Sequence, residues 1–357
     1  MLIKDIAKFN PKGTKSKEYI NYVDTSSVED GKLIDVQMLF SDYPSRAQRV
    51  ISKDDILISS VRPNLKHNYY INNHIENGVA STGFIQIRVF SEKVIPKYLY
   101  YFLTEENKVK MYQNIAETSQ STFPSFNKEV IENIEFPNIS LADQQHIVDI
   151  LGTLDEKIEN LEKINVNLQN YCLAQYRLLF SGIEQVPLSD IATIIMGQSP
   201  AGNTLSEKDG TIFYQGRTDF GFRYPAIRLF TTEPKRMAKA NDILLSVRAP
   251  VGDVNIASAD CCIGRGIAAI SSKHNSFIYY SIINQKSDFD IYNNSGTIFG
   301  SINRDALQSF KIAASDESII IAFEKIAALV DKKIYNNTAE IIKLKKLKQM
   351  YLKKFFE

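Results

Sequence analysis

Arginine, lysine and amide side chains gather in the predicted loops of both halves of this 357-residue chain. An arginine can donate two hydrogen bonds to the edge of a guanine, and asparagine or glutamine can pair with adenine in a similar way. Lysine, serine and backbone groups near glycine are suited to holding phosphate. The candidate DNA-contacting residues of the first half are Lys12, Lys15, Arg46, Arg49, Arg62, Lys66, His67, Ser119, Gln120, Ser121 and Thr122. Those of the second half are Gln198, Ser199, Arg217, Arg223, Arg228, Arg248 and Arg265.

Each of these side chains could instead be an ordinary solvated surface residue, and the sequence leaves that alternative open. Arg62 and Arg248 lie in two similar segments, DDILISSVRP (54–63) and NDILLSVRAP (241–250). We therefore expect the two arginines to occupy the same place in both halves. An arginine that recurs in this way is expected to contact phosphate or to form a structural ion pair, rather than to read a base.

Residues that could form an active site do not gather in any pattern we recognise. The four histidines show no metal-ligand spacing, and no phosphate-binding loop or catalytic triad can be nominated. We therefore predict no catalytic residue, no metal and no cofactor in this chain. The net charge of +1 neither favours nor excludes a nucleic-acid partner, because basic residues can cluster on one face.

Composition is that of an ordinary soluble globular protein, with 44% hydrophobic and 23% charged residues. The three cysteines, Cys172, Cys261 and Cys262, suggest no disulfide framework. No apolar run is long enough for a signal peptide or a membrane span. The expected location is a reducing cytoplasm, with no membrane partner.

The elements that would position these loops are set by an internal repeat. The segment 147–168 matches 323–344 at a constant offset of 176 residues, which places Asp155 on Asp331. Shorter matches follow in the same order: KDIA (4–7) with SDIA (189–192), STG (81–83) with GRG (264–266), and FPSFNKEVI (123–131) with FGSINRDAL (299–307). Such a repeat indicates two similar structural units within one chain.

A heptad pattern of apolar residues recurs in both copies of the strongest match and predicts two long helices. Its seam residues are Leu151, Leu154, Ile158, Leu161 and Leu168 in the first copy, and Ala327, Val330, Ile334, Ile341 and Leu344 in the second. Ser140 with Asp143 reads as a helix start, Asp316 is the equivalent cap, and Gly182 with Pro187 follows the first helix.

About 40 residues would span roughly 60 Å, too long for one small domain to cover, so the natural partner of each helix is the other. The open alternative is that each helix packs on its own globular domain. Polar residues interrupt the seam at Asn165, Gln175, Asn337 and Lys348, and such residues usually fix the register of paired helices. Six lysines between Lys343 and Lys354 either form a solvated helix end or contact phosphate.

The remaining segments read as mixed α/β (α+β) domains. Strand-like runs such as 55–61, 83–90, 242–247 and 267–271 are separated by turn residues, and short helices are expected at Pro96–Tyr112 and Asn275–Asn284. The predicted fold is therefore two copies of an α/β (α+β) recognition domain, joined by two long helices that form an antiparallel coiled coil with a pseudo-two-fold repeat. The expected divisions are 1–140, 141–183, 184–315 and 316–357.

The segment 123–168 (FPSFNKEVIENIEFPNISLADQQHIVDILGTLDEKIENLEKINVNL) resembles the end of a target recognition domain that runs into a central helical region. This arrangement is similar to that of the specificity subunit of type I restriction–modification systems, and the resemblance covers the whole chain. Its most specific parts are LADQQHIVDIL and the LDEKI that follows.

The resemblance implies that each recognition domain reads one half of a bipartite site in double-stranded DNA. It implies that the helices set the spacer between the half-sites and dock two modification (methyltransferase) subunits. Those partners would bind S-adenosylmethionine and methylate adenine, and restriction subunits can join them. The second copy lacks the Gln144–Gln145 pair, and the sequence leaves open whether both helices dock a partner equally well.

Two other functions remain open from the residues. The chain could be a coiled-coil interaction scaffold that does not contact DNA, or an enzyme with an unrecognised site. Salt-dependent binding of the assembled complex to duplex DNA separates the scaffold from the DNA reader, since phosphate contacts give a steep salt slope. Activity of the lone chain with DNA and S-adenosylmethionine would reveal the enzyme.

Overall fold

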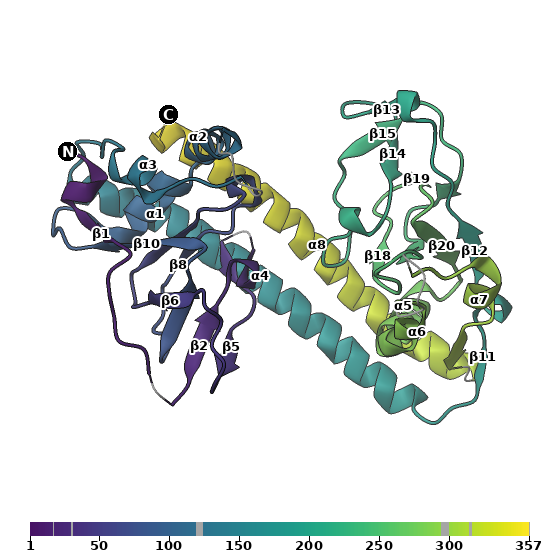
Figure 1. Ribbon diagram of the computed structural model, residues 1–357. Helices are drawn as coiled ribbons and strands as arrows, with labels where there is room; N and C mark the ends of the chain where they lie inside the picture. Colours follow the sequence, from purple (N-terminus) through teal and green to yellow (C-terminus); the bar gives the residue numbers. More distant parts are fainter. Residues whose placement is uncertain (17, 30, 119–123, 294–299, 314–315, 357) are drawn as a thin grey trace. The chain divides into compact units, whose positions relative to one another are not determined.

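The computed structural model describes residues 1–16, 18–29, 31–118, 124–293, 300–313 and 316–356 (Figure 1). The chain forms two compact units. Unit 1 comprises Met1–Glu159 and Ile342–Glu357, and unit 2 comprises Asn160–Ile341. Each unit therefore contains part of both long helices, so that the last residues of the chain complete the unit formed by the first. The four-part division expected above remains a prediction.

The two long helices are α4 (Leu141–Phe180) and α8 (Glu317–Phe356), each of 40 residues. The Ser140 hydroxyl accepts the backbone N–H of Asp143 at 3.1 Å, which satisfies a donor that the first turn leaves unpaired. At the start of α8, Asp316 accepts the N–H of Ser318 at 3.1 Å. After α4 the chain passes through Gly182, whose φ of +72° suits glycine. The predicted helix starts are confirmed.

Unit 1 contains two four-stranded sheets, of order β1-β10-β7-β8 and β5-β2-β9-β6, and a two-stranded pair β3-β4. All pairings are antiparallel except that of β2 with β9, which is parallel. The strands are β1 (Ala7–Phe9), β2 (Ile20–Val23), β3 (Val28–Glu29), β4 (Lys32–Leu33), β5 (Gln37–Leu39), β6 (Ala47–Val50), β7 (Ile56–Ser59), β8 (Tyr69–Tyr70), β9 (Gly78–Ser81) and β10 (Phe84–Val89). The helices are α1 (Pro96–Thr104), α2 (Glu106–Glu117) and α3 (Lys128–Glu132), with short 3-10 turns η1 (Ile3–Asp5), η2 (Thr25–Ser27) and η3 (Pro63–Leu65).

Unit 2 contains sheets of order β12-β20-β17-β18 and β13-β15-β14-β19-β16, and a pair β11-β21. The pairing of β14 with β19 is parallel. The strands are β11 (Gln185–Pro187), β12 (Thr193–Met196), β13 (Leu205–Ser206), β14 (Thr211–Tyr214), β15 (Leu229–Thr231), β16 (Met237–Ala238), β17 (Ile243–Ser246), β18 (Val254–Ile256), β19 (Cys261–Ile263), β20 (Ile267–Ser271) and β21 (Lys311–Ala313). The helices are α5 (Asn275–Asn284), α6 (Asp290–Asn293) and α7 (Arg304–Gln308), with 3-10 turns η4 (Leu188–Asp190), η5 (Gly202–Thr204), η6 (Arg217–Asp219) and η7 (Lys286–Phe289).

The two units share one topology, which confirms the internal repeat and the mixed helix and sheet content. The sheet β1-β10-β7-β8 corresponds strand for strand to β12-β20-β17-β18, and β5-β2-β9-β6 corresponds to β15-β14-β19-β16. Unit 2 adds β13 at the outer edge of β15. One helix expected over Pro96–Tyr112 is instead two, because Glu105 interrupts it and its carboxylate accepts the N–H groups of Asn107 and Lys108 as the cap of α2.

Each unit has a core that includes the start of one long helix and the end of the other. In unit 1 the aromatic residues of α1 pack with Leu151 of α4 and Leu352 of α8. In unit 2 the cluster includes Phe180 of α4 and Phe323 of α8, whose rings meet edge to face at 5.7 Å. The helices therefore pack on a globular domain and on each other, so neither expectation excluded the other.

Within each unit the paired stretches of α4 and α8 run antiparallel. In unit 2, Phe180 lies against Phe323, whereas the earlier Asn165 accepts a hydrogen bond of 2.8 Å from the later Asn337. Both asparagines are 3% exposed. In unit 1, Asp155 pairs with Lys348 at 2.5 Å. The ten predicted seam residues are all buried or half-buried.

The seam leaves its predicted positions at the end of each helix. A strict heptad continued from Gln175 and Lys348 reaches Leu179 and Tyr351, but the buried residues are Tyr176, Phe180 and Leu352, each one position later than the heptad. An α-helix with 3.6 residues per turn drifts relative to a strict heptad. Near its end, the buried face of each helix packs against the globular core of a unit as well as against the other helix. No helix among the described residues combines the length and apolarity needed to cross a membrane.

Candidate nucleic-acid interface

In unit 1, three backbone hydrogen bonds join the loop after β7 to two other segments. The N–H of Ser60 donates to Gly83 at 2.9 Å, and the carbonyl of Ser60 accepts the N–H of Phe126 at 3.0 Å. Two residues on, the N–H of Arg62 donates to Pro124 at 2.9 Å. The loop after β7, the turn before β10 and the segment before α3 thus meet at one junction, and the exposed Arg62 side chain lies on it.

In unit 2 the same three bonds recur. Val247 donates to Gly266 at 2.9 Å and accepts from Ile302 at 3.1 Å, and Ala249 donates to Gly300 at 2.9 Å. The loop after β17, the turn before β20 and the segment before α7 therefore form an equivalent junction. Both junctions bring together loops that are far apart in sequence, as surface-reading sites on a rigid scaffold generally do.

The register of these bonds corrects the expected match between Arg62 and Arg248. Val61 forms an isolated β-bridge with Ser125, and Arg248 forms the equivalent bridge with Ser301. Arg248 is thus the counterpart of Val61, and the counterpart of Arg62 is Ala249. The two segments look alike in sequence because both contain Val-Arg followed by proline within three residues, but the shorter serine run in the second shifts its arginine by one.

Other candidates of unit 2 lie on its junction. The N–H of Gln198 donates to Ile263 at 2.9 Å, and the hydroxyl of Ser199 accepts the N–H of Arg265 at 3.2 Å. The backbone approaches closely here, because a Cβ built on Gly197 would lie 2.1 Å from the carbonyl oxygen of Gly264. The side chains of Gln198, Arg248 and Arg265 are all exposed. This junction therefore presents hydrogen-bond donors of the types that read bases and hold phosphate.

In unit 1 the junction gathers fewer of the predicted residues. The carbonyl of Arg46 accepts the N–H of Thr82, next to Gly83, at 2.8 Å, so Arg46 borders the same turn as Arg62. Lys15 reaches the neighbouring residue, since its Nζ donates to the carbonyl of Ala47 at 2.7 Å. Lys12 is exposed in the segment before β2. The predicted residues Ser119–Thr122 lie outside the described residues.

Three candidates of unit 1 have surroundings that set them apart from the junction. Lys66 forms a 3.0 Å ion pair with Glu106, and this contact lowers the pKa of the glutamate. Arg49 lies on β6 and is half-buried, and burial lowers its pKa. His67 is half-buried beside Lys66. Lys66 and His67 lie later in the loop after β7, and none of the three residues takes part in the three backbone bonds that form the junction.

The loop between β14 and β15 carries three arginines of unit 2. Arg217 is exposed and pairs with Asp253 at 2.7 Å. Arg228 is exposed and pairs with Asp219, whose carboxylate also accepts the N–H of Gln215 at 2.7 Å. Both arginines keep hydrogen-bond donors at the surface, where a phosphate group could replace the carboxylate as their partner.

Arg223, in the same loop, is buried at 1% exposure, and the expectation that it contacts DNA does not hold. Its guanidinium stacks on the Tyr279 ring at 3.9 Å and contacts Asp331 of α8 at 3.1 Å. Burial opposes the charged form, but Tyr279 and Asp331 more than offset this effect, so the pKa of Arg223 is raised. The sequence carried one signal, since Arg223 stands between Phe222 and Tyr224 while Arg217 is flanked by Gly216 and Thr218, but the partners that bury it are distant in the chain.

Equivalent aspartates join the long helices to the rest of each unit. Asp155 of α4 accepts a hydrogen bond from Tyr101 of α1 at 2.8 Å, and Asp331 of α8 accepts one from Tyr280 of α5 at 3.3 Å. The sequence repeat had aligned the two aspartates. It gave no hint of their tyrosine partners, which come from helices that were predicted only as short elements.

Gln144, one of the two glutamines that the second copy lacks, has a local structural role. Gln144 is fully buried, accepts the N–H of Ile95 at 2.9 Å and donates to Lys93 at 2.9 Å, which ties the start of α1 to α4. In unit 2, Glu324 takes over this task and accepts the N–H groups at the start of α5, with 2.8 Å to Phe277. Gln144 therefore holds unit 1 together internally, and whether both helices dock a partner equally well stays an open question.

Among the described residues, no group of three or more His, Cys, Asp or Glu side chains is placed to hold a metal ion. The three cysteines are free and buried. Burial raises the pKa of the Cys261 thiol to about 12, which keeps it in the protonated, unreactive form. The junctions thus offer hydrogen-bond donors and positive charge as their chemistry.

A comparison with known protein families matches the type I restriction modification DNA specificity domain twice, over residues 2–170 and 181–349. The chain belongs to this family, and it holds two copies of the domain.

Curated relatives and a solved structure agree with this assignment. The protein named as the MjaX specificity subunit of a type I restriction enzyme of Methanocaldococcus jannaschii is 31% identical over 252 residues, which is 63% of this chain and 59% of that protein. The HindI specificity subunit of Haemophilus influenzae is 28% identical over 193 residues, 52% of this chain and 42% of that protein. The chain thus spans less than two thirds of the length of either relative. The crystal structure of the type I restriction-modification S subunit from M. genitalium has the same fold, with a TM-score of 0.60 at 14% identity over 100% of this chain and 95% of that one.

Proposed function

We propose that this chain is the sequence-recognition subunit of a type I restriction–modification complex, in which each unit reads one half of a bipartite DNA site. The observation that carries the proposal is the duplicated junction, whose three backbone bonds recur in both units. The shared bonds fix a common scaffold, while the side chains on it differ. Two different surfaces on one scaffold suit two different half-sites.

The chain's own part in the reaction is recognition and not catalysis. Exposed arginine and amide donors at each junction would contact base edges and phosphates. Adenine methylation would belong to two modification subunits that bind S-adenosylmethionine and dock on the long helices, and restriction subunits would join them. The complex would work in the cytoplasm. These roles come from the family resemblance and from the relatives' names.

The test is selection of a randomised duplex DNA pool by the full chain, purified together with its modification subunits. The expected result is two short conserved blocks separated by a stretch of fixed length and random sequence, with binding that weakens steeply as salt rises. Binding without sequence enrichment, or none at all, would contradict the proposal, and the second outcome would favour the interaction scaffold.

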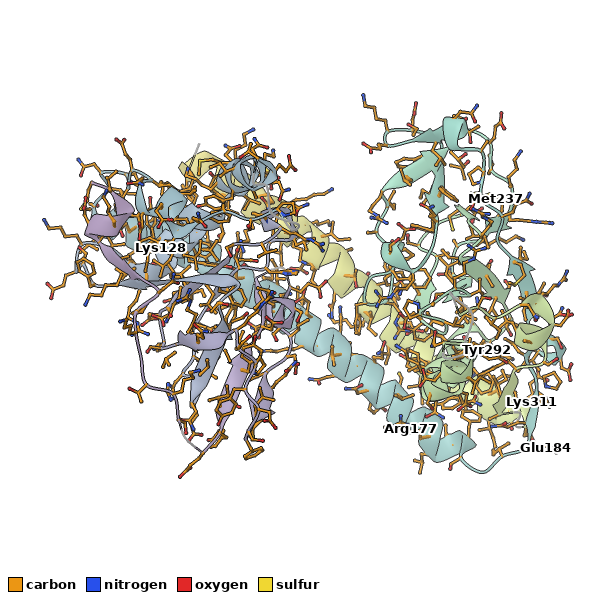
Figure 2. All side chains as sticks on the ribbon, in the orientation of Figure 1. Lys128, Arg177, Glu184, Met237, Tyr292 and Lys311 are labelled. Atoms are coloured by element: carbon orange, nitrogen blue, oxygen red, sulfur yellow. The ribbon has the colours of Figure 1, made fainter. Side chains whose placement is uncertain are left out.

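Single substitutions in unit 2 make the test residue-specific. Arg248→Ala and Arg265→Ala are expected to weaken binding to the selected site, because each removes an exposed donor at the junction. Arg177, on α4 near its C-terminal end (Figure 2), donates to Asn284 at 2.8 Å. It is an exposed arginine outside the junction. Arg177→Ala is the matched control and should leave binding unchanged.

A further inference from the structure

Arg223 is the most deeply buried charged side chain of a loop that is otherwise rich in exposed residues. The loop joins β14 to β15 and spans residues 215–228. Besides its contacts with Tyr279 and Asp331, Arg223 donates from Nη2 to the Tyr280 hydroxyl at 2.9 Å. One guanidinium thus joins the loop to α5 and to α8 at once.

The backbone around Arg223 is tied down by further bonds. The Arg223 carbonyl accepts the N–H of Ile256 at 2.8 Å, and the Asn255 side chain both donates to and accepts from Gly221 at 3.0 Å. The neighbouring Tyr224 ring meets Tyr335 of α8 edge to face at 5.4 Å. The centre of the loop is therefore fixed to β18 and to the long helix.

The start of the same loop reaches the candidate interface, and Asp219 links its other end back to that start by pairing with Arg228 and accepting the N–H of Gln215. At its start, a Cβ built on Gly266 of the junction would lie 3.1 Å from the Cα of Gly216. Arg217 follows directly, and Arg228 lies near the other end of the loop. Arg217 lies six residues before Arg223 and Arg228 lies five residues after it, so a shift at the fixed centre of the loop can reach both exposed arginines.

Unit 1 stabilises the equivalent aspartate in another way. The ion pair of Asp155 is with Lys348, which belongs to α8 itself, and the position equivalent to Lys348 on α4 is the buried Cys172. In unit 1 this pair therefore joins helix to helix. In unit 2 the pair of Asp331 with Arg223 joins helix to loop.

We propose that Arg223 is a positioning residue for DNA reading by unit 2: its buried contacts with Asp331, Tyr279 and Tyr280 hold the β14–β15 loop so that Arg217 and Arg228 face the half-site. The inference rests on the proposed function and adds a specificity-determining residue that does not itself touch DNA. Arginine suits this place because its planar group stacks on one ring and contacts two further partners, which a lysine cannot do in the same geometry.

The test repeats the selection from randomised duplex DNA with Arg223→Ala and Arg223→Lys, in the full chain with its modification subunits. Arg223→Ala should lose roughly tenfold or more of its discrimination in one sequence block and keep the other, as when a specific base contact is removed. Arg223→Lys should recover part of it, because the charge beside Asp331 is restored. The matched control is Lys348→Ala, which removes the ion pair of Asp155 and should keep both blocks.

Two outcomes would overturn the inference: retention of both blocks by Arg223→Ala, or equal weakening of both blocks. If Arg223→Ala does not fold, Tyr280→Phe gives the answer, since it removes one partner of the guanidinium and keeps the ring; the same block should weaken, and unchanged blocks would contradict the role. Failure of the proposed function itself looks different, because the unmodified protein would then select no bipartite sequence.

Discussion

Asp155 and Asp331 occupy equivalent positions on α4 and α8, and each accepts a hydrogen bond from an equivalent tyrosine, yet their ion pairs differ. Asp155 pairs with Lys348 of the other long helix, with both side chains partly exposed. Asp331 pairs with Arg223 of a loop, and that guanidinium is fully buried. The duplication kept the acceptor and changed the donor, so the same anchor point serves helix pairing in unit 1 and loop positioning in unit 2.

The largest expected difference between the units comes from removing the two cations. Arg223→Ala leaves the carboxylate of Asp331 without its buried partner and should lower the free energy of unfolding by about 3–5 kcal/mol. Lys348→Ala breaks a partly exposed pair and should cost at most about 1 kcal/mol. Urea unfolding of both variants measures the difference. Equal losses would show that the two anchors are energetically alike.

Asn165 and Asn337, the polar pair on the helix seam, should give the next largest effect on stability. Asn337→Ala should destabilise the protein by about 1–3 kcal/mol, because it leaves the buried amide of Asn165 without a partner. The repeat places Ile341 and Leu161 where Asn165 and Asn337 would recur. Replacing both asparagines by leucine should therefore recover most of the stability in thermal unfolding. A double variant as unstable as the single one would contradict the burial argument.

Gln144 and Glu324, which hold the starts of α1 and α5, should differ less in what they contribute to stability. Glu324→Ala should cost about 1 kcal/mol, as loss of a helix cap does. Gln144→Ala should cost at least as much, since Gln144 is fully buried and bonds three backbone groups. Hydrogen exchange at the first turns of α1 and α5 would report each loss locally. Faster hydrogen exchange at the first turn of α1 in Glu324→Ala would contradict the assignment of Glu324 to the start of α5.

The smallest effect concerns the stability of the fold at low pH. Burial raises the pKa of Asp253, but its bonds to Lys286 and Arg217 outweigh this, so the folded-state pKa is lowered. A carboxylate with a lowered pKa stabilises the fold above its ordinary value and loses that contribution as the pH falls through the lowered value. Asp253→Asn should therefore lower the free energy of unfolding by less than about 1 kcal/mol near pH 7. The difference between the variant and the unmodified protein should shrink below about pH 4. An unchanged acid limb of the stability curve would contradict the ion-pair geometry.

The sequence predicted the elements whose pattern is periodic. The heptads located α4 and α8, and the strand-like runs located β7, β10, β17 and β20, because these patterns follow directly from burial of one face. The helix α5 was predicted with its observed bounds. The internal offset of 176 residues is enough to align Asp155 with Asp331 from the residues alone.

What the sequence could not predict depends on contacts between distant segments. Arg223 was grouped with Arg217 and Arg228 because all three are arginines of one predicted loop, while its burial depends on Tyr279 and Asp331. The match of Arg62 with Arg248 was a misalignment that the residues could have corrected, because 54–63 and 241–250 aligned end to end already place Val61 on Arg248, as the strand bridges do. Tyr176 and Leu352 were missed because the strict heptad ignores helix drift.

The central claim is that two readers share one pair of long helices, and lengthening those helices tests it most directly. Seven residues inserted between Glu159 and Asn160, and seven between Ile341 and Ile342, preserve the seam and lie at the boundary of the two units. Each insertion adds roughly 10 Å of helix. At about 3.4 Å per base pair, the spacer between the two conserved blocks should grow by roughly three base pairs with the blocks unchanged. A spacer of unchanged length would contradict the account.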